Sequence, residues 1–179
     1  MGVKTEEGIQ EVSRVIICDT GPLIHLHEAD AIHLLKLAGD ILIPPAVASE
    51  FGRNPANGNL PNWIQIYELS ARAAGQVERW VRNDDVDLGE AEAIALALQQ
   101  HSDWLLTDDA EARQFAEGLG LEVHGSIGLL LWAVVAGHIK NRAQAHQTLN
   151  GLRRSSLWIS ERVVAAAVEA IDELFDNPR

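Results

Sequence analysis

Short apolar runs alternate with amphipathic stretches along most of the chain. Runs of apolar residues that end at turn residues or at the start of a helical pattern predict buried strands at 15–18, 41–43, 104–107 and 121–124. Partial alternation at 63–69 predicts an edge strand. Apolar residues at helical spacing predict helices over 23–37, broken near Asp30, and over 45–51, 71–81, 89–100, 110–118, 127–136, 142–152 and 161–175.

Proline, aspartate and serine residues mark where several of these helices begin. Pro22 and Pro45 suit a first helical turn, and Asp87 and Ser126 are placed to cap the helices that follow them. Strands that alternate with helices predict an α/β protein in which helices cover both faces of a parallel sheet. We expect residues 14–176 to form one such domain and residues 1–13 to be a loosely ordered lead-in.

The composition narrows the class of protein. Apolar residues make up 47% and charged residues 22% of the 179 positions, which excludes wholesale disorder. The single cysteine, Cys18, excludes a disulfide framework and a zinc site built from cysteines, and it fits a reducing cytoplasm. The apolar run at 127–136 is too short to span a membrane, and the polar N-terminus lacks the apolar part of an export signal.

Charge is distributed unevenly along the chain. The net charge of −12 argues against a broad basic surface for duplex nucleic acid. Residues 78–122 carry 12 acidic and 3 basic side chains, whereas residues 123–160 carry 4 basic and no acidic ones. This basic stretch is either a solvated helix face or a contact for RNA or an acidic partner. Its members are Lys140, Arg142, Arg153 and Arg154.

Acidic residues recur where the predicted strands end. Asp19 follows the first strand, and Asp108 and Asp109 follow the third. Glu50 lies on the helix after the second strand, and Glu90 opens the helix before the third. Because the carboxyl ends of parallel strands meet at one edge of a sheet, we expect these side chains to lie together. Clustered carboxylates favour a neutralising cation, and oxygen ligands select Mg²⁺ or Mn²⁺, which can activate water against a phosphodiester.

Each of these residues also has a simpler explanation by itself. An aspartate after a strand is a common turn residue and helix cap, which suits Asp19, Asp108 and Asp109. Glu50 and Glu90 taken singly are typical solvated helix residues. The joint placement of all five at strand ends is what favours a functional site.

Six short motifs, in this order and spacing, resemble those of the PIN-domain nucleases. They are Asp19-Thr20-Gly21-Pro22-Leu23-Ile24, Ile43-Pro44 with Val47 and Glu50, Leu88-Gly89-Glu90 with Ala93-Ile94, Leu106-Thr107-Asp108-Asp109 with Ala112-Arg113, Leu119-Gly120-Leu121, and Gly125-Ser126 with Gly128-Leu129-Leu130. The resemblance runs from Val15 to about Leu174. It is closest to the largely uncharacterised prokaryotic PIN-like branch related to the toxin ribonucleases of toxin–antitoxin pairs.

This resemblance implies a three-layer α/β/α sandwich with a central parallel sheet. It also implies Mg²⁺- or Mn²⁺-dependent endonucleolytic cleavage of single-stranded RNA, often by homodimers. In the toxin role the chain would have an antitoxin protein as a partner and would act in the cytoplasm. The apolar residues of 23–37 independently favour a homodimer.

The resemblance also assigns roles to the five acidic residues. Asp19, Glu50 and Glu90 match the first three acidic positions of the family. The fourth position falls at Asp108 or Asp109; the related toxins favour Asp109, and the closer branch favours Asp108. We expect Asp19, Glu90 and Asp108 to bind the metal, with Glu50 and Asp109 as further catalytic residues that assist, for instance by activating water.

Three further positions bear on this expectation. Thr20 and Ser126 match supporting hydroxyl positions of the family near the metal. Many of the toxins carry another aspartate where this chain has Ala112, so this chain has one carboxylate fewer than they have.

Other readings of the sequence predict different sites. A phosphatase of the haloacid-dehalogenase type also has an aspartate after its first strand, but its Asp-x-Asp motif needs a second one where this chain has Gly21. A second alternative is a non-catalytic PIN-like module that binds a partner. His25 and His27 point to different sides of a helix and cannot share a metal ion. The five tryptophans are expected in the core.

Overall fold

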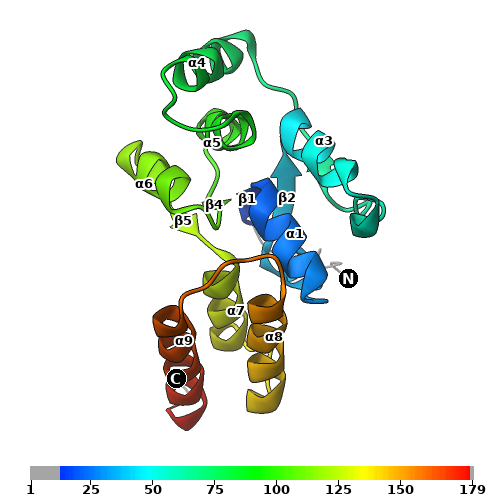
Figure 1. Ribbon diagram of the computed structural model, residues 1–179, viewed down its shortest axis with the longest axis vertical. Helices are drawn as coiled ribbons and strands as arrows, with labels where there is room; N and C mark the ends of the chain where they lie inside the picture. Colours follow the sequence, from blue (N-terminus) through cyan, green and yellow to red (C-terminus); the bar gives the residue numbers. More distant parts are fainter. Residues whose placement is uncertain (1–12, 178–179) are drawn as a thin grey trace, which may run out of the picture.

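A five-stranded parallel sheet lies at the centre of the computed structural model, which describes residues 13–177 (Figure 1). The strands are β1 Val15–Cys18, β2 Asp40–Ile43, β3 Gln65–Ile66, β4 Trp104–Leu106 and β5 Val123–His124. Their order across the sheet is β3-β2-β1-β4-β5, and each neighbouring pair is parallel. The lead-in predicted for residues 1–13 lies, except for its last residue, outside the described residues.

The strands follow the predicted pattern with changes at their ends. β1 has the predicted boundaries, and β2 begins one residue early, at Asp40. β4 stops before Thr107, although the Thr107 amide still donates to the carbonyl of His124 at 2.9 Å. The fourth predicted strand begins only at Val123, and the predicted edge strand shortens to two exposed residues. Both shortened strands lie at the edges of the sheet, where only one neighbour supplies ladder hydrogen bonds.

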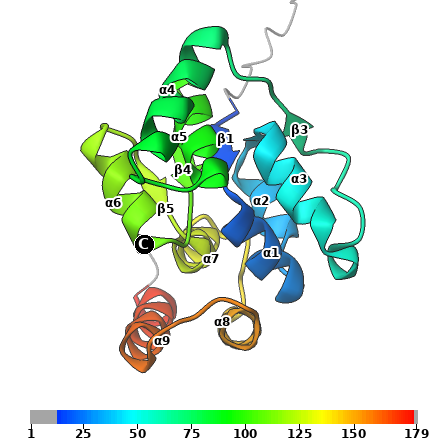
Figure 2. The ribbon, with the colours of Figure 1, turned by 45° about the horizontal axis from the view of Figure 1, so that its top comes forward.

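Helices cover both faces of the sheet. Helices α1 Thr20–Glu28 and α2 His33–Ala38 connect β1 to β2, and α6 Ala110–Gly118 connects β4 to β5 in the opposite direction along the sheet. Because such crossovers are right-handed, these connections lie on opposite faces. Helices α4 Ala71–Arg82 and α5 Leu88–Gln100 lie beside α6 (Figure 2). The predicted three-layer α/β/α sandwich with a parallel sheet is therefore confirmed.

The remaining helices extend the molecule below the sheet as it is drawn in Figure 1. Helices α7 Ser126–Val135, α8 Arg142–Arg154 and α9 Glu161–Asp176 pack against one another, and α7 also contacts α1 and α2. Helix α3 Pro45–Arg53 and the short 3₁₀ helix η1 Pro55–Asn57 follow β2. The loop of residues 155–160, between α8 and α9, passes close to the carboxyl ends of the strands (Figure 1).

Local sequence explains most helix boundaries. Asp87 caps α5 as predicted, and Pro45 begins α3. The break between α1 and α2 contains Asp30, whose φ of 56° cannot continue a right-handed helix. The predicted cap of α7 at Ser126 is wrong: Gly125 is the N-cap, and Ser126 is the first helical residue. The hydroxyl of Ser126 is bonded to a carboxylate from another part of the chain, so it does not cap its own helix.

Most of the apolar residues that predicted these elements form a continuous core. Cys18 is buried in β1, as its strand position predicts. Trp80 and Trp104 are also buried, but Trp158 is 87% exposed. The expectation that the tryptophans belong to the core is therefore wrong for Trp158. No helix within residues 13–177 combines the length and the apolar character needed to cross a bilayer.

Candidate active site

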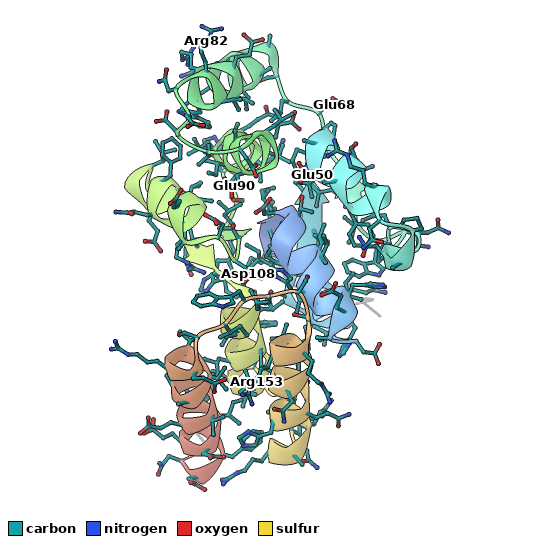
Figure 3. All side chains as sticks on the ribbon, viewed as in Figure 1. Glu50, Glu68, Arg82, Glu90, Asp108 and Arg153 are labelled. Atoms are coloured by element: carbon teal, nitrogen blue, oxygen red, sulfur yellow. The ribbon has the colours of Figure 1, made fainter. Side chains whose placement is uncertain are left out.

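A cavity of about 460 Å³ opens at the carboxyl ends of the central strands. All five predicted carboxylates line it: Asp19, Glu50, Glu90, Asp108 and Asp109. They come from the ends of β1 and β4 and from helices α3 and α5, and the three that Figure 3 labels lie around the same space. The topology thus brings together acidic residues that are as much as 90 positions apart.

Asp19 lies deepest among them, with only 7% of its surface exposed. Its Oδ1 accepts a hydrogen bond from the backbone amide of Thr20 at 2.7 Å, and its Oδ2 accepts one from the hydroxyl of Thr107 at 3.1 Å. Burial raises the pKa of Asp19 to about 6 despite these two hydrogen bonds, which favour the charged form. The neighbouring acidic side chains of Asp87 and Glu50 raise it further.

Glu90 is the second carboxylate with a strongly raised pKa. Burial raises the pKa of Glu90 to about 7, and the nearby Asp87, Asp109 and Asp19 add to that rise. Glu90 also closes a capping box at the start of α5: its Oε2 accepts from the Asp87 amide at 3.1 Å, and its own amide donates to Asp87 Oδ1 at 2.9 Å. Its side chain therefore has a structural role as well as a place in the cavity.

Glu50 is held at the cavity by a hydroxyl and by a close approach of helix α5. The Thr20 hydroxyl donates to Glu50 Oε2 at 2.5 Å. A Cβ atom placed on Gly89 would lie 2.8 Å from the same oxygen. Position 89 therefore has to be glycine for α5 to begin this close to Glu50 in its present position.

Asp108 is bound on both of its oxygens. Oδ1 accepts from the backbone amide of Ser126 at 2.7 Å, and Oδ2 accepts from the Ser126 hydroxyl at 2.6 Å. Oδ2 also lies 2.7 Å from Nδ1 of His25 on α1. With two partners on Oδ2 and one on Oδ1, the free lone pair of Asp108 belongs to Oδ1. Ser126 thus supports the site through Asp108, without lining the cavity itself.

Asp109 caps helix α6 and still faces the cavity. Its Oδ1 accepts from the amides of Glu111 at 2.8 Å and Ala112 at 2.9 Å. Both of these capping hydrogen bonds go to Oδ1, and among residues 13–177 none of them goes to Oδ2 of Asp109. Asp109 can therefore be a helix cap and a site residue at once: Oδ1 caps α6, and Oδ2 is left for the cavity.

The donors in this cavity fit a hard divalent cation by their chemistry. All of the carboxylates offer oxygen, and burial disfavours the bare anions of Asp19 and Glu90, so a bound cation would stabilise their charged forms. As the side chains lie, however, the described part of the chain has no group of three His, Cys, Asp or Glu residues placed to hold one ion. The side chain of Glu90 is directed to the Asp87 amide.

Two residues at the cavity were missed as site residues from the sequence. His25 was considered only as a partner of His27, yet it contacts Asp108 and lines the cavity. The sequence did hold a sign of this position. Helix α1 begins directly at the end of β1, and His25 lies one helical turn after Gly21, on the side of α1 near the strand end. Asp87 was predicted only as a helix cap, and it too lines the cavity.

A comparison with protein families identifies the family to which this chain belongs. A model described as a PIN domain matches residues 15–173, which is most of the chain. This chain belongs to the PIN-domain family. PIN domains are generally nucleases and typically use divalent metal ions. No curated protein matches the sequence significantly.

Membership in the PIN-domain family confirms the resemblance expected from the six motifs. It also removes the support for a phosphatase of the haloacid-dehalogenase type, because the strand-end aspartates that suggested it belong to a PIN domain. The cavity of this PIN domain lies within the matched residues, as do all five carboxylates.

Proposed function

We propose that this PIN domain is a metal-dependent endoribonuclease that cleaves phosphodiesters of single-stranded RNA. The observation that carries the proposal is the convergence of five carboxylates on one cavity at the strand ends, two of them with a strongly raised pKa. Such a cluster is costly for a fold unless the cavity takes up a cation. Family membership supports nuclease chemistry at this place.

Within this proposal, Asp19, Glu90 and Asp108 hold Mg²⁺ or Mn²⁺. The bound ion would supply polarisation of the phosphodiester and a lower pKa for the attacking water. Asp108 has its free lone pair on Oδ1, and Asp109, which also lines the cavity, can add Oδ2. Glu90 has to leave the Asp87 amide to take part, which costs about one hydrogen bond.

The remaining groups would position the attacking water and its proton. Glu50 is the residue we assign to accept that proton, because it lines the cavity and the Thr20 hydroxyl fixes its Oε2. Thr20 is therefore a positioning residue for Glu50. Asp108 is in turn held in place by Ser126 and His25, so its orientation does not depend on the ion.

Ion pairs within the chain reduce the number of basic residues in the 123–160 stretch that are available to contact a substrate. Arg142 lies near Asp172 and Asp176 on α9, and Arg153 pairs with Glu161 at 2.8 Å. These two arginines are neutralised within the chain, which favours a structural role for them. A contact of this stretch with RNA or with an acidic antitoxin would fall to Lys140 and Arg154.

We also propose that the protein acts as a toxin, that it is located in the cytoplasm and that it forms a homodimer. A short reading frame beside the gene would favour an antitoxin partner. The dimer cannot use most of the apolar residues that suggested it, because Leu23, Leu26, Leu34 and Leu35 are buried in the chain's own core. Leu37 is the large apolar side chain of this region that stays exposed. Sedimentation at micromolar concentration tests the dimer, which should have twice the 19.5 kDa mass of the chain.

The experiment that tests the proposal measures Mn²⁺ binding and RNA cleavage on the same variants. Asp19→Asn and Asp108→Asn should each abolish Mn²⁺ binding in calorimetric titration and cleavage of a mixed single-stranded RNA, while the fold survives. Glu68→Gln is the matched control, because Glu68 is exposed and lies away from the cavity in Figure 3. Wild-type Mn²⁺ affinity in both aspartate variants would refute the site. Mn²⁺ binding without cleavage of any RNA would favour the non-catalytic module.

A further inference from the structure

A second cavity, of about 490 Å³, adjoins the carboxylate cavity on the side of α7 and α9. We call it the Trp158 cavity; its lining includes Arg113, His124, Ile127, Leu157, Trp158 and Val163. The two cavities share Asp108, Ala110, Leu157 and Trp158 in their walls. The two cavities are therefore neighbours, close enough for one extended ligand to contact both.

Trp158 is the most exposed large apolar side chain among the described residues, at 87%. Tryptophan is largely buried in most folded proteins, because its ring offers 150–250 Å² of mainly apolar surface. A ring left in solvent on the wall of two cavities is thus a feature that core packing does not explain.

The backbone on both sides of Trp158 is fixed in place. The amide and the hydroxyl of Ser156 both donate to Glu28 Oε2 on α1, at 2.6 and 2.8 Å. After the tryptophan, Ile159 packs against the core and Ser160 caps α9. The loop therefore presents the ring from a held backbone, which lowers the entropy that a ligand contact would cost.

The polar groups around the Trp158 cavity suit a flat, polar-edged ligand. The Arg113 guanidinium donates to the carbonyls of Val123 and Thr107 at 3.1 and 3.2 Å, which holds its plane in the cavity wall. Gly125 lets this guanidinium lie close to the backbone, because a Cβ there would lie 2.9 Å from Nη2 of Arg113. An indole ring, a held guanidinium and apolar side chains together are the groups on which unpaired bases stack.

We propose that the Trp158 cavity is a binding subsite for one unpaired nucleobase of the RNA strand whose phosphodiester lies in the carboxylate cavity. This inference rests on the proposed function and adds its substrate class, an RNA with an unstacked base beside the cleaved bond. Base pairing would block the subsite, since a paired base cannot leave its stack to reach the Trp158 ring. The subsite would therefore favour single strands over duplexes.

The test measures binding separately from cleavage. A fluorescein-labelled oligoadenylate of about 15 nucleotides, within the usual site sizes for single strands, is titrated with the full chain in Ca²⁺ and in Mn²⁺ by anisotropy. Trp158→Ala should weaken binding at least about fivefold, the loss expected for one base–aromatic stack. Trp158→Phe keeps a ring and should bind within about twofold of wild type.

Three comparisons make the result specific for stacking. Val135→Ala removes another exposed apolar side chain, at the opposite end of α7, and should leave oligoadenylate binding unchanged. Inorganic polyphosphate, which has the charge but no bases, should bind wild type and Trp158→Ala equally. An RNA duplex of the same length should bind wild type at least about fivefold more weakly than the single strand.

The outcomes separate this inference from the proposed function. Equal binding of oligoadenylate by wild type and Trp158→Ala overturns the subsite, even where RNA is cleaved, and would leave the Trp158 ring for a protein partner. Binding that depends on Trp158 without cleavage in Mn²⁺ supports the subsite and refutes the nuclease. Failure of wild type to bind any single strand overturns the subsite as well.

Discussion

Both carboxylate oxygens of Asp108 accept a hydrogen bond from one residue, Ser126. The backbone amide of Ser126 reaches Oδ1 at 2.7 Å and its hydroxyl reaches Oδ2 at 2.6 Å. Asp108 follows β4 and Ser126 opens α7, so this pair joins the end of a central strand to the helix that follows the edge strand β5. The pair explains why a serine stands at position 126 although Gly125 caps the helix.

Replacing Ser126 should therefore cost more stability than a typical surface serine. Ser126→Ala removes a donor to a charged acceptor whose side chain is only 9% exposed, and we expect a loss of about 1.5–3 kcal/mol in the free energy of unfolding. Thr148→Val is the control, because the Thr148 hydroxyl donates to the neutral carbonyl of Gln144 at 3.1 Å and its loss should cost at most about 0.5–1.5 kcal/mol. Urea unfolding measures both, and equal losses would contradict the role of the charge.

Substitution of Gly89 should reduce cleavage of RNA with little effect on the stability of the fold. A methyl group at this position would come within 2.8 Å of Glu50 Oε2, so Gly89→Ala should push the carboxylate away from Thr20. The displaced group is the end of a flexible side chain, and alanine favours helix, so unfolding stability should change by less than about 1 kcal/mol. Cleavage should fall at least about tenfold if Glu50 handles the proton of the attacking water.

A second glycine supplies the control for this prediction. Gly75 lies within α4, where a Cβ would meet nothing within 4 Å. Gly75→Ala should raise the free energy of unfolding by about 0.5–1 kcal/mol and leave cleavage unchanged. Equal activity of Gly89→Ala and Gly75→Ala would show that the position of Glu50 does not matter for the reaction.

The raised pKa of Asp19 predicts how stability depends on pH in the absence of metal. Its pKa is about 6 in the folded chain against an ordinary 3.8, so the folded chain binds more protons than the unfolded chain between these values. The contribution of Asp19 to stability therefore falls as the pH rises from about 4 to about 6, and it stays lower above that range. We expect this contribution to amount to roughly 3 kcal/mol.

Asp19→Asn should remove this part of the pH dependence. Urea unfolding in EDTA at pH 5 and at pH 8 should show a smaller fall in stability for the variant than for wild type. The Asn side chain can still cap α1, and the Thr107 hydroxyl can reverse its role to accept from the amide. Glu28→Gln is a control with no effect in this window, because the hydrogen bonds from Ser156 lower the pKa of Glu28 and its contribution to stability is lost only below its ordinary pKa of 4.5. Identical pH profiles for wild type and Asp19→Asn would contradict burial as the cause.

The sequence predicted the parts of this fold that local patterns determine. Apolar runs located the central strands, and the strand-end rule placed Asp19, Asp108 and Asp109 at one edge of the sheet. The pattern could not predict how much of each edge strand would pair, because the ladder of β3 and of β5 depends on a single neighbour from a distant part of the chain.

Side-chain partners across long separations were the other part that the sequence did not predict. His25 meets Asp108 across 83 positions, and Ser156 meets Glu28 across 128. No local period encodes such contacts, because they follow from the packing of whole helices. The exposure of Trp158 was not predicted either. Tryptophan as a residue type indicates burial, whereas the position of Trp158 in the α8–α9 loop leaves its ring in solvent.

Glu90 and Glu92 provide the clearest test of which carboxylates form the site. They lie two positions apart on α5, so their side chains point to different sides of the helix. Glu90 lines the carboxylate cavity, whereas Glu92 Oε2 accepts from the Ala46 amide at 2.9 Å and so holds the start of α3. The contact with the Ala46 amide gives Glu92 a structural role, away from the carboxylate cavity.

Glu90→Gln should lose cleavage at least about tenfold, while Glu92→Gln stays within about threefold of wild type. Glutamine at position 90 can still accept from the Asp87 amide, so the capping box and the stability of α5 are kept while the charge is removed. Glutamine at position 92 can likewise accept from Ala46. If both glutamates only stabilise the helix start, each substitution costs about 0.3–1 kcal/mol and neither affects cleavage. Assays of both variants on a mixed single-stranded RNA with Mn²⁺ decide between these outcomes. Equal activity in the two, or loss only in Glu92→Gln, would place the reaction away from the carboxylate cavity.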